Sequence, residues 1–322
     1  MRLRCVPTPE QRAALEAQLV RLQQPGAALE LPCERTDLVR VTTTVASVHT
    51  DRFVVRARLS FRSGEERSYA LKAYADDFAG RAWTHTRALA ERYRTDAGEL
   101  CLPIACTASE RLLVFPWVEG AALAGIVDES KPRLLRRAAR MIADLHRLDW
   151  APEPPTSAER LVEQTLARCN EPAELIAPLR AQLVEAMRHL DPTDPAPVHG
   201  DLGAGQFLLA GERLVLLDFD MLGYADPAYD AGHFLAQLER RVVVDGTPSV
   251  QGDRWLGAFQ DAYLAAQPRV SLRNMAFYRA LTLVRKMSTL RRRGVSSGGV
   301  FHELARRASA ALEQMAAPAV AP

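Results

Sequence analysis

The sequence has no marked excess of charge of either sign. Its 41 basic residues nearly balance 39 acidic ones, and a net charge of +2 favours no class of partner. Two short basic runs, Arg136–Arg137 and Arg291–Arg293, have no interleaved aromatic residues. We therefore interpret them as solvated helix faces and predict no nucleic-acid partner.

Long apolar runs are also missing, so we predict no membrane partner. The charged N-terminus precedes no apolar segment of the kind found in secretory signals. The five cysteines are odd in number, and only Cys101 and Cys106 lie close together. No histidine or second cysteine pair completes a zinc pattern. These absences predict reduced thiols and a cytoplasmic location.

The hydrophobic residues that are present, 48% of the chain, follow two different periods. Residues 8–24 have apolar side chains at helical intervals, and Pro25–Gly26 is a natural stop. Residues 41–48 are rich in valine and threonine, and apolar and polar residues alternate along 53–61. Together with residues 67–74, these segments are typical of strands. This part of the sequence predicts a helix followed by an antiparallel meander.

The remainder of the chain is mostly helical in pattern. A helix over 77–94 and an apolar strand over 112–115 precede residues 117–120, a natural pivot between two lobes. We therefore predict an α+β fold. Its small antiparallel-sheet N-terminal lobe, with the N-terminal helix, covers 1–116, and its larger helical C-terminal lobe covers 117–322 and contains a two-stranded hairpin.

That hairpin joins the two most informative motifs. His199 to Gln206 is rich in glycine and contains Asp201, and the apolar run 214–217 leads into Asp218-Phe219-Asp220. We expect the three neighbouring glycines to permit unusual backbone angles that aim Asp201 into a cleft. They are Gly200, Gly203 and Gly205. A carboxylate placed there can orient an acceptor hydroxyl and take up its proton.

Asp218 follows a buried strand and is a natural ligand for Mg²⁺, which prefers oxygen donors. The amide oxygen of Gln206 is a second candidate ligand. Alone, Asp218 and Asp220 would be interpreted as residues that cap a turn. Their spacing from Asp201 favours phosphoryl transfer, in which one carboxylate serves the hydroxyl and another holds the metal.

Lys72 lies in an apolar strand, where an unpaired ammonium group is costly. The phosphates of ATP would supply its partner. The alternative is an edge-strand lysine that points to solvent.

In this order, the motifs resemble those of the aminoglycoside phosphotransferase and choline kinase family, small-molecule kinases with a bilobal protein-kinase-like fold. The resemblance covers residues 40 to 240 and rests on six segments. They are Leu71-Lys72, the hinge-like Leu113 to Gly120, Ala143-Asp144-Leu145-His146, the two acidic motifs, and Asp226-Pro227-Ala228-Tyr229-Asp230.

The resemblance implies ATP and Mg²⁺ as cofactors. Asp201 would be the catalytic base, and Gln206 and Asp218 the metal ligands. Lys72 would contact the ATP phosphates, and two hinge residues would contact the nucleotide. These hinge residues are Phe115 and Trp117. The resemblance also gives supporting roles: Asp230 would brace the catalytic loop, and His199 would buttress it. His146 would be a packed core histidine rather than a catalytic one, and Asp220 would be structural or, alternatively, metal-adjacent.

Three departures from the family pattern stand out. Gln206 replaces the usual asparagine, which moves the amide oxygen by more than about 1 Å. No glycine-rich phosphate loop precedes Lys72. The helix after Lys72 has no obvious glutamate partner for it, and Glu91 lies late in that helix.

The predicted function is transfer of the γ-phosphate of ATP to a hydroxyl of a small molecule: a sugar, an amino alcohol or an antibiotic. A nucleotide-binding pseudokinase is the alternative that Gln206 and the missing glutamate favour. A protein kinase is disfavoured, because Asp218 to Asp230 is too short for an activation loop. Arginines between Phe234 and Leu312 favour a neutral or anionic acceptor over a polycationic aminoglycoside. They include Arg240, Arg241, Arg279, Arg285 and Arg291.

Overall fold

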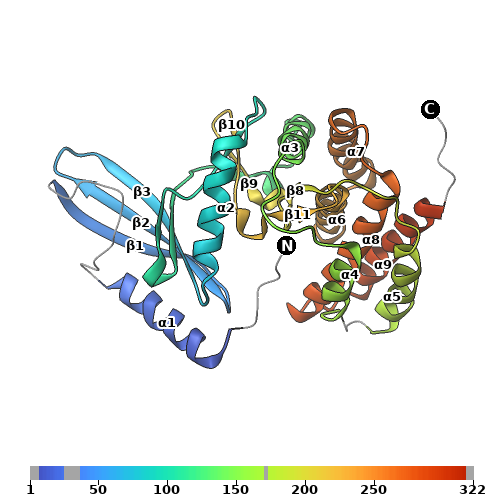
Figure 1. Ribbon diagram of the computed structural model, residues 1–322, viewed down its shortest axis with the longest axis horizontal. Helices are drawn as coiled ribbons and strands as arrows, with labels where there is room; N and C mark the ends of the chain where they lie inside the picture. Colours follow the sequence, from blue (N-terminus) through green and yellow to red (C-terminus); the bar gives the residue numbers. More distant parts are fainter. Residues whose placement is uncertain (1–6, 25–36, 170–172, 317–322) are drawn as a thin grey trace.

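The computed structural model describes residues 7–24, 37–169 and 173–316. Figure 1 shows an elongated molecule with a sheet at one end, a group of helices at the other and short strands between them. The predicted α+β fold, an antiparallel sheet followed by a helical part, is confirmed.

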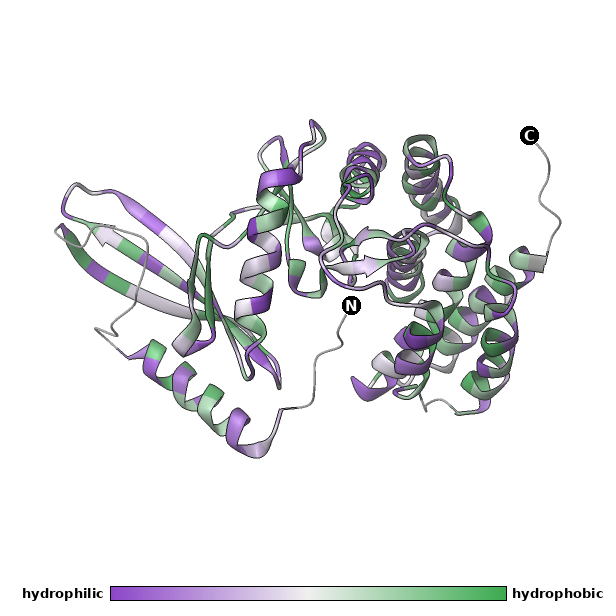
Figure 2. Cartoon of the chain, in the orientation of Figure 1, coloured by the Kyte–Doolittle hydropathy of each residue, from purple (hydrophilic) through white to green (hydrophobic). Residues whose placement is uncertain are grey.

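A five-stranded antiparallel sheet forms the N-terminal end. In spatial order its strands are β1 (Leu38–Val48), β2 (Arg52–Phe61), β3 (Glu66–Tyr74), β6 (Leu112–Pro116) and β5 (Ala105–Thr107). Alternation along β2 buries Val55, Ala57 and Leu59 completely, as the sequence predicts. Figure 2 shows this alternation as green and purple bands along the strands.

Two helices cover opposite faces of this sheet. Helix α1 (Pro9–Gln23) begins at a Thr8 capping box and packs Leu15 and Leu22 against the core that contains β2. Helix α2 (Phe78–Arg92) packs against the other face, beside Tyr74. Because side chains alternate along β3, Lys72 shares the Tyr74 face, away from α1.

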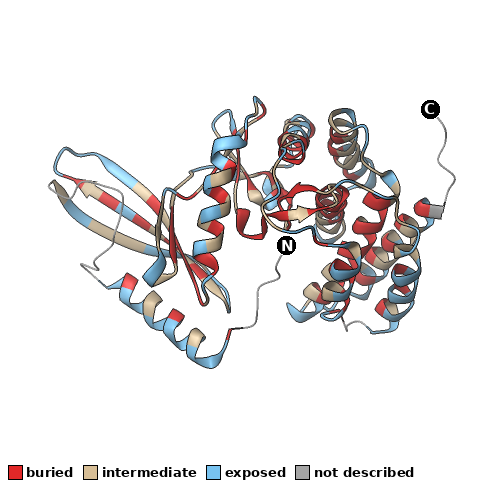
Figure 3. Ribbon diagram, in the orientation of Figure 1, coloured by how far each residue is buried: buried red, intermediate tan, exposed pale blue. Residues whose placement is uncertain are grey.

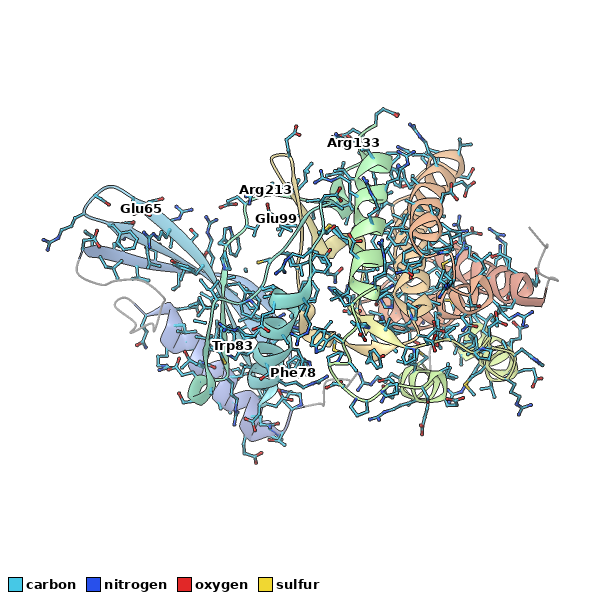
Figure 4. All side chains as sticks on the ribbon, turned by 45° about the horizontal axis from the view of Figure 1, so that its top comes forward. Glu65, Phe78, Trp83, Glu99, Arg133 and Arg213 are labelled. Atoms are coloured by element: carbon cyan, nitrogen blue, oxygen red, sulfur yellow. The ribbon has the colours of Figure 1, made fainter. Side chains whose placement is uncertain are left out.

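Short strands connect the sheet to the helices. The hairpin of β9 (Phe207–Ala210) and β10 (Arg213–Leu216) pairs with β4 (Glu99–Leu100) and β7 (Ala121–Ala122), so the predicted two-stranded hairpin is the centre of a four-stranded sheet. Strands β8 (Ala196–Val198) and β11 (Gly223–Ala225) pair beside it. An ion pair of 3.0 Å between Arg213 and Glu99, both labelled in Figure 4, joins β10 to β4.

The helical part consists of α3 (Lys131–His146), α4 (Ala158–Leu166), α5 (Ala173–Met187), α6 (Ala228–Val244), α7 (Ser249–Ala266), α8 (Leu272–Arg292) and α9 (Gly298–Ala316). Figure 3 shows how much of α6 and α8 is buried. These two helices approach closely at Gly232, where a Cβ atom would lie 2.4 Å from the carbonyl oxygen of Met275. A side chain at this position would push α6 and α8 apart.

Three further predictions concern the cysteines, the membrane and the boundary between the lobes. Cys101, Cys106 and Cys169 are free thiols, whereas Cys5 and Cys33 lie outside the described residues, as does the predicted stop at Pro25–Gly26. Among the described helices, none combines the length and the hydrophobicity needed to cross a bilayer. The lobe boundary after Pro116 stays a prediction, although β6 ends there.

Candidate active site

The backbone of the loop that contains Asp201 is hydrogen-bonded to the side chain of Asp230, in the first turn of α6. Asp230 Oδ2 accepts a hydrogen bond from the backbone N–H of His199 at 2.6 Å, and Oδ1 accepts one from Gly200 at 3.0 Å. His146 Nε2 lies 3.2 Å from Oδ2. Burial opposes ionisation of Asp230, but its contacts with His146 and the loop amides hold its pKa below the usual value. Asp230 thus contacts the backbone amides, as the resemblance implies.

The three loop glycines have different structural roles. Gly200 has a φ of +85°, in the left-handed region that favours glycine. Gly203 is extended, with a φ of −164°, and Gly205 has no positive φ. The prediction that all three supply unusual backbone angles is therefore wrong for Gly203 and Gly205. At Gly203 a Cβ atom would lie 3.1 Å from Gln206 Oε1, a close contact that the Gln206 side chain would have to relieve by moving slightly.

The carboxylate of Asp201 is held by two side chains that the sequence did not single out as its partners. Its Oδ1 lies 3.4 Å from His233 Nε2, on α6, and 3.3 Å from Arg285 Nη2, on α8. Arg285 Nη2 also lies 3.1 and 3.0 Å from the two ring nitrogens of His233. The Asp201 side chain remains 47% exposed, so it is fixed by its neighbours yet open on one side.

These contacts set the protonation states of the pair. Burial and the adjacent Arg285 charge lower the pKa of His233 to about 3, so its ring is neutral. The surrounding protein opposes ionisation of Asp201, but the hydrogen bond from His233 and the charge of Arg285 outweigh this and hold its pKa well below 3.8. Asp201 is therefore an ionised hydrogen-bond acceptor at neutral pH.

Asp218 occupies a strained backbone conformation at the end of β10. Its φ of +66° and ψ of +61° lie in the left-handed region, which costs a residue other than glycine roughly 1–2 kcal/mol. The preceding Leu217 is tied on both sides: its N–H donates to the Gln206 carbonyl at 2.8 Å, and its carbonyl accepts from His199 Nε2 at 3.0 Å. These bonds hold the Asp218 and Gln206 segments together, so strain is retained at a predicted functional position.

Lys72 reaches across from β3 to this segment. Its Nζ lies 2.7 Å from Asp218 Oδ1 and 2.7 Å from Asp220 Oδ2, and Tyr74 donates to the other oxygen of Asp220 at 2.7 Å. The edge-strand alternative for Lys72 is therefore wrong, because the side chain is buried and paired. Its carboxylate partners come from the turn after β10, and Glu91 instead pairs with its neighbour Arg92.

A cavity of about 420 Å³ opens beside Lys72 and Asp218, between the N-terminal sheet and the β9–β10 hairpin. Phe115 and Trp117, both predicted to contact the nucleotide, line it. The other apolar lining residues include Val54, Ala70, Leu208 and Leu217. Trp117 Nε1 is buried without a hydrogen-bond partner among the described residues. An apolar cavity with a cation at one end suits a base attached to phosphates.

A second cavity, of about 290 Å³, lies on the other side of the loop. Asp201 and Gln206 line it together with residues of α6 and α8. Its cationic lining residues are Arg240, Arg241, Lys286 and Arg293. The predicted site residues therefore gather around two neighbouring cavities, with Asp201 and Gln206 at one and Lys72, Phe115, Trp117 and Asp218 at the other.

The arginines that were counted in the sequence separate into different roles. Arg279 pairs with the buried Glu239, and Arg285 pairs with Asp201. Arg240 and Arg241 alone among the five line the second cavity. Lys286, which does line it, was missed by the sequence analysis. Its position one residue after Arg285 in a helix gave no signal, because neighbouring helical residues face different directions.

The fold is that of solved small-molecule kinases. Choline kinase LicA from Streptococcus pneumoniae superimposes with a TM-score of 0.58 at 14% identity, covering 85% of this chain and 94% of the kinase. Amicoumacin kinase hAmiN, solved with AMP-PNP, Ca²⁺ and Ami, gives 0.60 at 14% identity over 95% and 96%. A thermostable mutant of aminoglycoside phosphotransferase APH(4)-Ia gives 0.58 at 13% identity over 87% and 97%.

Sequence comparison supplies the family. Residues 40–280, most of the chain, match the model of the phosphotransferase enzyme family, and the chain therefore belongs to that family. A search of curated proteins finds no match. The suspected family is thus confirmed, and the coarse prediction of a small-molecule phosphotransferase holds.

Proposed function

We propose that this protein is a kinase that uses ATP and Mg²⁺ to phosphorylate a hydroxyl group of a small molecule. One observation carries the proposal: Lys72 meets Asp218 beside a nucleotide-sized apolar cavity, and Asp201 lines a polar cavity next to it. The resemblance to a kinase solved with AMP-PNP supports a nucleotide in the first cavity.

In this proposal Phe115 and Trp117 contact the base, and Lys72 contacts the phosphates. Asp201 orients the acceptor hydroxyl and accepts its proton as the new bond forms. The low pKa of Asp201 makes orientation the larger part of its contribution, since a weak base removes a proton only late in the reaction.

Asp218 and Gln206 fit a magnesium ion chemically, because both offer hard oxygen donors. The 2.8 Å hydrogen bond between the Leu217 N–H and the Gln206 carbonyl keeps their segments adjacent. When bound, the ion would offset the negative charge of the phosphates.

The pseudokinase alternative depended partly on the absence of a carboxylate partner for Lys72. Lys72 has two such partners, Asp218 and Asp220, and Asp201 keeps an ionised carboxylate open to its cavity. These contacts favour an active kinase. We also propose a cytoplasmic location, with which the free thiols Cys101, Cys106 and Cys169 are compatible.

The test is a screen of ADP formation with ATP and Mg²⁺ against sugars, amino alcohols and antibiotics. Asp201→Asn should lower turnover by roughly 100-fold or more, because general base and orienting groups contribute on that scale. Asp261→Asn, an equal charge change on an exposed face of α7, should have no effect. Unchanged turnover in Asp201→Asn would remove the proposed base.

Gln206→Asn should preserve or raise activity, because it retains the amide oxygen. Complete loss of activity would mean that the longer side chain is specifically required. Independently of any acceptor, ATP with Mg²⁺ should raise the melting temperature of the wild-type protein. Absence of a shift at millimolar ATP would count against both the kinase and the pseudokinase.

A further inference from the structure

The cavity beside Asp201 carries positive charge that no described carboxylate balances. Arg240, Lys286 and Arg293 line it, and none of the three forms an ion pair with the described residues. Arg240 Nε is also buried without a hydrogen-bond partner there. Arg241 differs, because its guanidinium pairs with Asp245 at 3.0 Å.

The one acidic residue that lines the cavity offsets only part of this charge. Asp201 is paired with Arg285 at 3.3 Å, so the charges of these two residues largely cancel. Three cations are then left facing the space next to the proposed base. Such a cluster of like charges is unfavourable unless an anion occupies the cavity.

The positions of these cations are fixed by two packed helices. Lys286, Thr289 and Arg293 are spaced three and four residues apart, so they follow one face of α8 to its end. Gln237 and Arg240 are three apart on α6. The close helix contact at Gly232 joins the two walls, so the cavity is preformed rather than assembled by loops.

The protonation behaviour of the cluster is consistent with a missing counterion. Burial, reinforced by the charge of Arg285, lowers the pKa of Lys286 to about 7. Asp201 opposes this shift, whereas Arg240 and Arg293 add to it. Burial and the neighbouring arginines also lower the pKa of Arg240. A bound anion would reverse both shifts, because opposite charge favours the protonated form.

We propose that the acceptor is a hydroxyl compound that also carries a phosphate monoester, and that this group binds Arg240, Lys286 and Arg293. The proposal rests on the kinase function above and names the acceptor class for that site. A phosphate monoester carries about −1.5 to −2 charges at pH 7 and has three terminal oxygens. It matches three cations, whereas a carboxylate leaves more of their charge uncompensated and an aminoglycoside would add to it.

In the proposed reaction, the acceptor hydroxyl oxygen forms a bond to the γ-phosphorus of ATP. The bond from that phosphorus to the β–γ bridging oxygen breaks, and ADP leaves with its electron pair. The hydroxyl proton passes to Asp201 and then to solvent. The product is a bisphosphate, and the original phosphate group is unchanged.

Binding tests the proposal without knowledge of the acceptor. Inorganic phosphate is titrated calorimetrically into the protein saturated with AMP-PNP and Mg²⁺, so that phosphate cannot occupy the nucleotide site. We expect one phosphate site, weakened roughly 10- to 100-fold in Arg240→Gln and in Arg293→Gln by loss of a charge-assisted hydrogen bond. Arg293 is exposed at the end of α8, so its replacement leaves the fold intact.

Arg254→Gln is the matched control, because Arg254 is an exposed arginine of α7 that pairs with Glu129, away from the cavity. It should bind phosphate as the wild type does. Absence of binding up to about 10 mM phosphate would overturn the proposal, and so would equal binding by Arg240→Gln, Arg293→Gln and Arg254→Gln.

Turnover identifies the anion. Two series of acceptors are compared: glycerol, glycerate and glycerol 3-phosphate in the first, and ribose and ribose 5-phosphate in the second. Within each series we expect kcat/KM to be at least about tenfold higher for the phosphate ester. Preference for glycerate would mean that the cavity recognises a carboxylate and would overturn the proposal. Preference for glycerol or ribose would overturn it as well. AMP-PNP affinity, measured separately, should be unchanged in Arg240→Gln. Loss of nucleotide binding by the wild type would instead refute the kinase function itself.

Discussion

The hydrogen bonds that Asp230 makes to the catalytic loop predict a large loss of stability in Asp230→Ala. The substitution leaves the backbone N–H groups of His199 and Gly200 buried without acceptors. Each unsatisfied group costs about 1–3 kcal/mol, so the free energy of unfolding should fall by about 2–6 kcal/mol. That is a large fraction of the roughly 5–15 kcal/mol that stabilises an ordinary domain.

Asp230→Asn separates the lost charge from the lost acceptors. The amide keeps one oxygen for one of the two N–H groups but presents its NH₂ group to the other, so we expect about 1–3 kcal/mol of destabilisation. Urea unfolding followed by tryptophan fluorescence measures both variants. The matched control is Asp261→Asn, because Asp261 is exposed on α7 and forms no ion pair with described residues. If Asp230→Ala unfolds within about 0.5 kcal/mol of the wild type, the bracing role is refuted.

Two further predictions concern stability and pH. Glu239→Ala should lower the free energy of unfolding by about 3–5 kcal/mol, because Glu239 is buried and its loss leaves Arg279 without its carboxylate, whereas Arg307 keeps Glu303. Urea unfolding again measures this, and a change below about 1 kcal/mol would contradict it. Because the pKa of Asp201 lies well below 3.8, the pH profile of kcat/KM should show no acidic limb from this group between pH 5 and 8. The stability that its ionisation contributes should be present above about pH 4 and lost only below it. An acidic limb between pH 5 and 8 whose midpoint moves when residues in contact with Asp201 are substituted would refute the low pKa of Asp201.

The sequence predicts the fold well where periodicity is strong. Alternation in 53–61 and the apolar run 214–217 correspond to β2 and to β10, because burial of one face is a local property of the sequence. The mostly helical pattern that follows the pivot corresponds to α3, α4 and α5, although the pattern alone does not fix where each helix begins and ends.

At the site, the sequence identifies residues but not their partners. The pairing of Lys72 with Asp218 spans 146 positions, and nothing in either local segment indicates it. The same applies to His233 and Arg285, which meet Asp201 only because α6 and α8 pack side by side. Glycine composition was also misleading, because only Gly200 of the three loop glycines adopts the left-handed backbone conformation.

Helix α6 combines several functions along one face. Asp230, His233, Gln237 and Arg240 stand three, four and three residues apart, over about 15 Å of helix. The first braces the loop, the second contacts Asp201, and the last two line the cavity proposed for the acceptor. Insertion of one residue between His233 and Gln237 would rotate the C-terminal part of the helix by about 100°. Gln237 and Arg240 would then no longer lie on the same face as Asp230 and His233. Substitution at Arg240, by contrast, leaves the Asp230 end of the helix unchanged, so acceptor specificity in the proposed cavity can evolve without altering the residues that hold the Asp201 loop.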